Sequence, residues 1–168
     1  MDIQVVVANL VKQPDAQAVI NSANANLRLG SGVAGAIHTA AGDELEDYCE
    51  QFAPLALGMA VITPGFKLPN QYVIHARAGH YLFEEEAEAY LESAYRSALS
   101  IAVTHNIKSV AMPAMGIGVF KFPVELAAEV TAKVLRSPEW DDTSLNWVRL
   151  CVTDEALKAA YIAALGGA

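Results

Sequence analysis

A short segment in the first quarter of the chain concentrates residues that can bind phosphate through the backbone. Residues 30–35 read Gly-Ser-Gly-Val-Ala-Gly, after the apolar pair Val19-Ile20 and at the start of a pattern with an apolar residue at every fourth position. Glycine permits positive φ angles and close approach of a ligand to the main chain. The first N–H groups of a helix have no partner within the helix and can bind an anion. The segment therefore predicts a phosphate-binding loop, with candidate ligands Gly30, Ser31, Gly32, Val33 and Ala34.

The two common nucleotide-binding motifs do not describe this loop. Gly30, Gly32 and Gly35 have the G-x-G-x-x-G spacing, but no acidic residue stands about twenty positions after Gly35, as the dinucleotide-binding motif requires. No Lys-Ser or Lys-Thr pair follows it, as would be required of a P-loop. Phosphate binding at this segment would therefore depend on backbone N–H groups at a helix N-terminus.

A second glycine-rich loop follows the apolar run 110–112. Residues 115–120 read Met-Gly-Ile-Gly-Val-Phe and precede a helical pattern, whose first turn is marked by Pro123 and Glu125. One such loop alone is as often a packing turn as a ligand site. Two loops of this kind favour a ligand, and the candidate residues in the second are Met115, Gly116, Ile117, Gly118, Val119 and Phe120.

Short apolar runs alternate with helical patterns along the chain. The runs that predict buried strands are 3–7, 18–20, 59–62, 72–74, 110–112 and 147–152. Apolar residues at helical spacing predict helices in 33–45, 90–102, 126–134 and 156–165. This alternation predicts an α/β fold, with a mixed or largely parallel central sheet covered by helices on both faces. Ligands of such sheets bind at the carboxyl ends of the strands, where both glycine-rich loops begin.

The composition indicates one globular domain over residues 1–168. Hydrophobic residues make up 54% of the chain and charged residues 18%, and no low-complexity tract indicates a linker or disorder. The formal charge of −8, without any cluster of Lys or Arg, argues against tight binding to nucleic acid. A small phosphorylated ligand is compatible with this charge, because a helix N-terminus binds anions without basic side chains.

The sequence also favours a cytoplasmic protein that binds neither a membrane nor a metal. The N-terminus lacks the basic flank of a secretory signal. The most apolar stretch, 53–62, is interrupted by Pro54 and Gly58 and is shorter than the ~20 residues of a membrane span. Cys49 and Cys151 are the only cysteines and lie in no metal-ligand spacing.

The remaining polar residues are interpreted as structural or solvated. His38, His75, His80 and His105 have no spacing typical of a metal site or a catalytic triad. The acidic run 84–86 precedes a helical pattern, and we expect it to form a solvated first turn, where the helix dipole favours negative charge.

Several segments together resemble the macro domain family. Residues 19–24 and 27–37 resemble its signature V-N-A-A-N, then L, then G-G-G-V-A-x-A-I. Residues 72–75 resemble its V-I-H strand, and residues 113–123 resemble its phosphate loop P-x-x-x-x-G-x-x-x-x-P. The order and spacing agree from Ile3 to Leu165, so the resemblance covers nearly the whole chain.

The resemblance implies a three-layer α/β/α sandwich with a cleft for ADP-ribose, an ADP-ribosylated side chain or O-acetyl-ADP-ribose. Both loops would hold the diphosphate, without a cofactor or metal. Asn24 would bind the hydroxyls of the distal ribose and, in a catalytic member, orient that ribose. Asn21 would brace the loop, and Phe120 would either pack over the distal ribose or make a core contact.

The sequence departs from the family pattern at the adenine end of this cleft. Many macro domains have Gly-Asp-Ile where this chain has Ala8-Asn9-Leu10. The neutral amide of Asn9 is a weaker acceptor for the adenine amino group than a carboxylate, by about 1 kcal/mol. Thr153 stands just after the last strand, where family members often carry an aromatic residue that stacks on adenine. Asn9, Leu10 and Thr153 stay candidate ligands, but weaker adenine selectivity is expected.

Two further departures concern the first loop. Ser31 replaces the middle glycine, which requires a negative φ at that position. Ala34 stands where one hydrolytic subgroup has Asp, which excludes a carboxylate base there.

Three functions stay open on this sequence. The first is a non-catalytic reader of ADP-ribosylation. The second is a hydrolase that removes ADP-ribose from proteins or deacetylates O-acetyl-ADP-ribose, with a water positioned by the ligand phosphate and the loop backbone. The third is a binder of another nucleotide or nucleoside diphosphate. The oligomeric state is left open as well.

Overall fold

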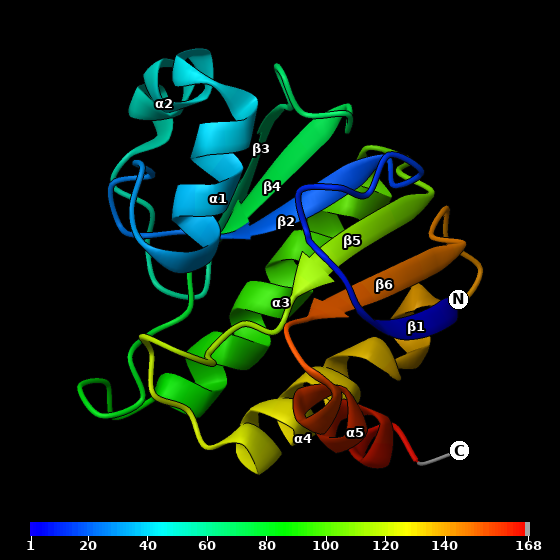
Figure 1. Cartoon of the computed structure of the whole chain (residues 1–168). Coiled ribbons are helices and arrows are strands. Elements are labelled where there is room, and N and C mark those ends of the chain that lie inside the picture. Colours follow the sequence, from blue (N-terminus) through cyan, green and yellow to red (C-terminus); the bar gives the residue numbers. More distant parts are fainter. Residues whose placement is uncertain (167–168) are drawn as a thin grey trace.

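The computed structural model describes residues 1–166, which form three layers with a six-stranded sheet in the middle (Figure 1). The strands are β1 (Asp2–Val7), β2 (Ala18–Ser22), β3 (Ala60–Pro64), β4 (Tyr72–Ala76), β5 (Ser109–Pro113) and β6 (Trp147–Val152). They lie in the order β1-β6-β5-β2-β4-β3, and only the β3–β4 pair is antiparallel. The predicted mixed, largely parallel sheet and all of its predicted strands are confirmed.

Two groups of helices cover the two faces of the sheet (Figure 1). One group comprises α1 (Gly32–Ala41) and α2 (Asp43–Cys49), followed by the 3-10 helix η1 (Glu50–Phe52). The other comprises α3 (Ala87–Thr104), α4 (Val124–Leu135) and α5 (Glu155–Ala164), with the 3-10 helix η2 (Pro138–Trp140) before β6. Within residues 1–166, no helix is long and apolar enough to cross a membrane.

The apolar runs of the central strands arise because both faces of the sheet are covered. Val19 and Val73 belong to a core cluster with residues of α1 and α2, whereas Ile20 and Ile74 belong to a cluster with residues of α3. All four side chains are fully buried. Successive residues of a strand point to opposite faces, so a strand buried on both sides is apolar without alternation.

The apolar spacing over residues 33–45 is divided between two helices. α1 ends at Ala41, and Gly42 adopts a φ of 88° before α2 begins at Asp43. A Cβ atom at Gly42 would lie 3.0 Å from the Cδ atom of Lys67, in a conformation that favours glycine. Ile37 of α1 and Leu45 of α2 still share one core cluster.

The parallel strands bring both glycine-rich loops to one edge of the sheet. β1, β6, β5, β2 and β4 run in the same direction, so their carboxyl ends meet there. The segments 8–10, 23–31, 114–123 and 153–154 leave the sheet at this edge. This is the edge at which the sequence predicted a ligand.

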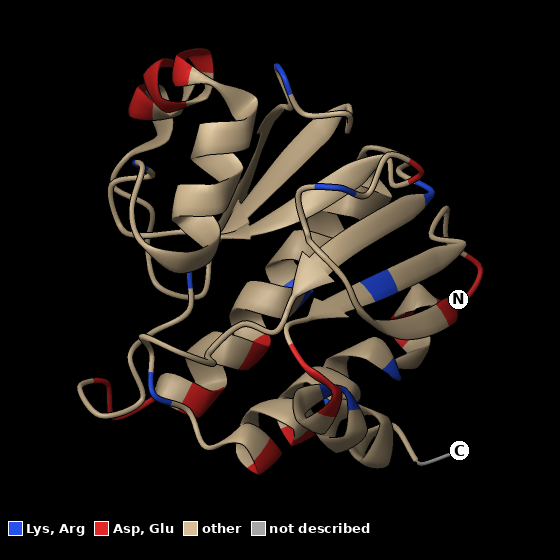
Figure 2. Cartoon of the chain, viewed as in Figure 1, with Lys and Arg blue, Asp and Glu red and all other residues tan. Residues whose placement is uncertain are grey.

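Acidic residues gather at the N-terminal ends of helices (Figure 2). The run 84–86 differs slightly from expectation, because α3 begins only at Ala87 and Glu86 is its N-cap residue. The three glutamates therefore belong to the connection between β4 and α3 rather than to the first turn of the helix.

Candidate functional site

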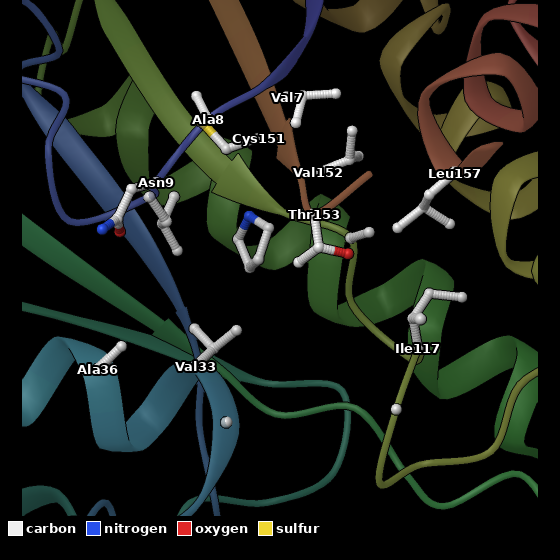
Figure 3. A pocket seen from close by; sticks show the side chains of 15 residues that line it. Val7, Ala8, Asn9, Val33, Ala36, Ile117, Cys151, Val152, Thr153 and Leu157 are labelled. Carbon is white, nitrogen blue, oxygen red and sulfur yellow. The ribbon is translucent and has the colours of Figure 1, made fainter. Parts of the chain in front are cut away.

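A cavity of about 750 Å³ lies at the carboxyl edge of the sheet (Figure 3). It is lined by Val7, Ala8, Asn9, Leu10, Gly32, Val33, Ala36, Pro113, Ala114, Ile117, Gly118, Cys151, Val152, Thr153 and Leu157. These residues come from the ends of β1, β5 and β6, from the segments that follow these strands, and from the N-terminal halves of α1 and α5. Most of them are aliphatic, so the cavity is an apolar space bordered by a few polar groups.

The N-terminus of α1 forms one wall of this cavity. Ser31 is the N-cap residue, with a φ of −86°, and its hydroxyl makes no capping hydrogen bond. The condition of a negative φ at this serine is therefore met. Among residues 1–166, the N–H groups of Gly32, Val33 and Ala34 have no acceptor, and the first bond back into the helix comes from Gly35. Three parallel donors at the positive end of a helix can bind an anion.

The glycines of the first loop have different roles. Gly32 has a φ of +60°, and a Cβ atom there would meet nothing within 4 Å, so this residue leaves space beside the free donors. At Gly35, by contrast, a Cβ atom would lie 2.3 Å from the carbonyl oxygen of Gly30. Gly30 itself lies against Asn24, because a Cβ atom there would be 3.0 Å from Nδ2 of that residue. Gly35 and Gly30 thus let the loop pack closely onto α1.

The amide of Asn24 holds the turn that precedes this loop. Its Nδ2 donates to the carbonyl oxygen of Arg28 at 2.7 Å, and its Oδ1 accepts from the N–H of Arg28 at 3.0 Å. Leu27, inside the turn, has a positive φ of 56°. One amide hydrogen and one oxygen lone pair of Asn24 remain for a ligand. The assignment of Asn24 to a distal ribose stays a prediction.

The second loop supplies a further set of backbone donors. Within the described part of the chain, the N–H groups of residues 117–120 have no acceptor. Gly118 has a φ of +83° and an open position for a Cβ atom, whereas a Cβ atom at Gly116 would lie 2.9 Å from the ring of Phe122. Ile117 and Gly118 line the cavity, and the side chain of Val119 points to solvent, 58% exposed.

Met115 does not take the place predicted for it. Its side chain is 1% exposed, and its N–H donates to the hydroxyl of Tyr95 at 2.8 Å. The Tyr95 ring is fully buried, and burial raises the pKa of its hydroxyl to about 12, so the hydroxyl stays protonated. Met115 therefore anchors the loop to α3 instead of contacting a ligand through its side chain or N–H.

The segment after β1 forms the other end of the cavity. Asn9 Oδ1 accepts a hydrogen bond from the N–H of Val11 at 3.2 Å, which leaves one lone pair for a ligand. The N–H of Leu10 has no acceptor within residues 1–166. Val152 and Leu157 line the adjoining wall, and no aromatic side chain is among the fifteen lining residues (Figure 3). No other part of this lining therefore supplies an aromatic ring in place of the one that family members often carry at position 153.

A buried polar chain links β2, β4 and β3. Asn21 is fully buried, and its Nδ2 lies 3.0 Å from Nδ1 of His75. Nε2 of His75 lies 2.9 Å from the Thr63 hydroxyl. Burial, with a smaller contribution from His38, lowers the pKa of His75 to about 3, so the ring is neutral at pH 7. The side chain of Asn21 is thus held against β4, and its role in bracing the first loop stays a prediction.

The cavity lining contains no group able to act as a side-chain base. None of the fifteen lining residues is a carboxylate or a histidine. Burial raises the pKa of the Cys151 thiol to about 11, so it is protonated and a poor nucleophile. Within residues 1–166, no three His, Cys, Asp or Glu side chains are placed to hold a metal ion.

The comparison with known proteins decides the family. The family model described as Macro domain matches residues 20–131. A macro domain-containing protein of Ralstonia nicotianae is 38% identical over 156 residues, which cover 90% of this chain and 87% of that protein. This chain belongs to the macro domain family.

Solved macrodomains have the same fold as this macro domain. A macrodomain of Oceanobacillus iheyensis with ADP superposes with a TM-score of 0.90 and 28% identity, over 97% of this chain and 89% of the other. A macrodomain of Trypanosoma brucei in complex with ADP-ribose has a TM-score of 0.88 and 27% identity, over 98% of this chain and 69% of the other. The mouse ADP-ribose glycohydrolase MACROD1 is 42% identical over 130 residues, which cover 75% of this chain and 39% of the enzyme.

The structure brings together only part of the residue set predicted from the sequence. Asn9, Leu10, Gly32, Val33, Ile117, Gly118 and Thr153 line the cavity, whereas Asn21, Asn24, Gly30, Ser31, Ala34, Met115, Gly116, Val119 and Phe120 do not. The sequence reasoning missed eight further lining residues, which are Val7, Ala8, Ala36, Pro113, Ala114, Cys151, Val152 and Leu157. For all of these except Ala36 the available signal was position, because they end or follow β1, β5 and β6 or begin α5 at one edge of the sheet.

Proposed function

We propose that this macro domain binds ADP-ribose, both free and attached to proteins. The observation that carries the proposal is the pairing of two sets of backbone donors, residues 32–34 and 117–120, beside one apolar cavity. A diphosphate between these donors would be held by neutral N–H dipoles, which suits a chain with a formal charge of −8. The related macrodomains solved with ADP and ADP-ribose support the choice of ligand.

The two ends of the ligand would meet different surroundings. The adenosine would enter the aliphatic end between β1, β6 and α5, where Asn9 Oδ1 and the N–H of Leu10 supply one acceptor and one donor. The distal ribose would lie toward Asn24 and Phe120. In this arrangement the diphosphate contributes most of the polar contacts, and the adenine contributes mainly buried apolar surface.

We propose hydrolysis of ADP-ribosylated side chains as a second function, supported by the 42% identity to MACROD1. Water would attack the anomeric carbon of the distal ribose, the bond to the ester oxygen of a modified glutamate would break, and that carboxylate would leave. Since no carboxylate or histidine lines the cavity, the attacking water would give its proton to a phosphate oxygen of the ligand. The loop N–H groups would stabilise the diphosphate throughout.

The binding proposal is tested by thermal unfolding with ADP-ribose. A ligand that binds only the folded state must raise the melting temperature. Gly32→Glu places a carboxylate beside the free donors and should abolish the rise. Gly32→Ala is the matched control, since it introduces the same backbone strain at a φ of +60° without the charge. A wild-type protein whose melting temperature does not change at millimolar ADP-ribose contradicts the proposal.

The hydrolysis proposal needs a separate measurement. Wild type, Gly32→Ala and Gly32→Glu are incubated with a protein carrying ADP-ribose on glutamate, and the released ADP-ribose is quantified. Wild type should release the ligand faster than buffer, and Gly32→Glu should not. If wild type binds ADP-ribose but releases it from the modified protein no faster than buffer does, the hydrolysis proposal fails and the protein is a non-catalytic reader.

A further inference from the structure

The connection between β4 and α3 presents large apolar side chains to solvent. Leu82 is 69% exposed and Phe83 is 79% exposed, and Tyr81 beside them is 36% exposed. Most surface residues of a folded domain are polar, and adjacent exposed aromatic and aliphatic side chains are typical of an interaction surface. We refer to residues 81–83 as the apolar loop.

The apolar loop has a defined structure of its own. The N–H groups of Phe83 and Glu84 donate to the carbonyl oxygen of His80 at 3.2 and 3.1 Å, and the N–H of Leu82 donates to the His80 ring at 3.1 Å. The Phe83 ring stacks on the His80 ring with centroids 4.1 Å apart. These contacts hold Leu82 and Phe83 outward, so their exposure is a property of the folded loop.

Carboxylates surround the apolar loop. A groove of about 430 Å³ is lined by Tyr81, Leu82, Phe83, Glu84, Glu85, Ala87 and Glu88. Three of its lining residues are glutamates and none is basic. Figure 2 shows this acidic stretch extending from the connection into the start of α3. The groove therefore combines apolar surface with negative charge, which is complementary to a polypeptide that carries Lys or Arg beside apolar residues.

The groove adjoins the second glycine-rich loop. The N–H of Tyr81 donates to the carbonyl oxygen of Phe120 at 2.7 Å, and the Tyr81 ring lies 5.1 Å from the ring of Phe122. Two residues before Phe120, Gly118 lines the ligand cavity. The groove is thus joined to the cavity through the segment 118–120, on the side assigned above to the distal ribose.

We propose that this groove binds the polypeptide that carries the ADP-ribosyl group, and that it selects modified sites flanked by Lys or Arg and by apolar residues. The inference rests on the proposed function, because the protein is attached to ADP-ribose through the distal ribose. The glutamates disfavour the main competing surfaces, since anionic phospholipids and nucleic acids carry the same sign of charge.

The test uses the full chain and two peptides modified with ADP-ribose on glutamate through a hydrolysis-resistant linkage. One peptide has Lys, Arg and Leu around the modified residue, and the other has Glu and Ser at the same positions. Dissociation constants for both peptides and for free ADP-ribose are measured by calorimetry. Two double variants are tested. The serine variant combines Leu82→Ser with Phe83→Ser, and the lysine variant combines Glu85→Lys with Glu88→Lys. The controls are Leu82→Ile with Phe83→Leu, which keeps the apolar surface, and Asp141→Lys, an exposed acid distant in sequence from the groove.

The wild-type protein should bind the basic peptide roughly tenfold more tightly than the acidic one. The serine variant should lose most of this preference for the basic peptide, and the lysine variant should reverse it. Both controls should keep the preference. All four variants should bind free ADP-ribose as wild type does. Equal affinity of wild type for the two peptides, with normal binding of free ADP-ribose, overturns the groove proposal alone. Failure of wild type to bind free ADP-ribose overturns the proposed function and this inference together. A wild-type dimer that the serine variant abolishes would instead assign the groove to a second copy of the chain.

Discussion

The side-chain nitrogen of Asn21 and Nδ1 of His75 lie 3.0 Å apart, and neither side chain has any exposed surface. The two residues stand opposite each other in the register of β2 and β4. An amide nitrogen can only donate, so Nδ1 accepts and Nε2 of His75 carries the proton that is directed at the Thr63 hydroxyl. A neutral His75 therefore fixes the orientation of Asn21 near the end of β2, the strand that leads into the segment 23–31.

This arrangement predicts that stability falls on acidification. The pKa of His75 is lowered from 6.5 to about 3, mainly by burial, so between these values the unfolded chain binds a proton that the folded chain does not. The free energy of unfolding should therefore decrease as the pH falls below about 6.5, with a contribution from His75 of up to about 1.4 kcal/mol per pH unit. Urea unfolding between pH 7 and pH 5 measures this slope.

The matched variants for this measurement are His75→Gln and His105→Gln. His75→Gln should be less stable at pH 7, but its free energy of unfolding should depend less steeply on pH. Some dependence should remain, because burial also lowers the pKa of His38. His105 is exposed, so its replacement should leave the slope unchanged. The same slope in wild type and His75→Gln would contradict the assignment.

A second prediction concerns the contact between Gly35 and Gly30. A methyl group at Gly35 would lie 2.3 Å from the Gly30 carbonyl oxygen, so Gly35→Ala must push the loop away from α1. We expect a loss of about 1–3 kcal/mol in the free energy of unfolding, as for other overpacked sites. ADP-ribose affinity should fall as well. Ala36→Gly, on the same helix, is the control for helix propensity, and equal stability of Gly35→Ala and wild type would be inconsistent with this packing.

A third prediction concerns adenine recognition. Asn9→Asp keeps an oxygen that can accept from the N–H of Val11 and replaces a neutral acceptor by a charged one. Affinity for ADP-ribose should rise by about 1 kcal/mol, roughly fivefold, because charged acceptors bind donors more strongly. The inosine analogue lacks the amino donor and should gain nothing. Calorimetry with both ligands gives the comparison, and an equal gain for both would place the amino group away from residue 9.

A fourth prediction concerns the segment that carries Asn9. Arg149 on β6 donates to both carboxylate oxygens of Asp15 at 2.8 Å and to Gln13 Oε1 at 2.9 Å. Arg149→Met should loosen residues 9–17, which hydrogen exchange would report as faster exchange in that segment, and should weaken ADP-ribose binding severalfold. Lys12→Met, an exposed change in the same segment, should do neither. Unchanged exchange in Arg149→Met would show that other contacts hold the segment, such as those from Asn70 Nδ2 to the carbonyl oxygens of Gln13 and Ala16.

Local sequence patterns were sufficient to predict the six strands, the main helical regions and the edge of the sheet that carries the cavity, but not the break between α1 and α2. Buried parallel strands need apolar residues at successive positions, and helices need them at every third or fourth position, so short segments such as 18–20 and 126–134 could be assigned without their neighbours. Glycines at strand ends identified both donor loops, and the absence of an aromatic residue at position 153 agrees with a cavity lining that contains no aromatic side chain.

Only the tertiary structure decided which polar groups are available to a ligand. Asn21 and His75 are 54 residues apart in sequence, and Met115 and Tyr95 are 20 residues apart. Each pair uses a hydrogen-bond donor that the sequence alone leaves free. The division of the glycines into open positions, Gly32 and Gly118, and packed ones, Gly35 and Gly116, depends on which atoms approach each Cα. The physical reason is common to both cases: residue type determines what a group can bond, but distant contacts determine whether it has already done so.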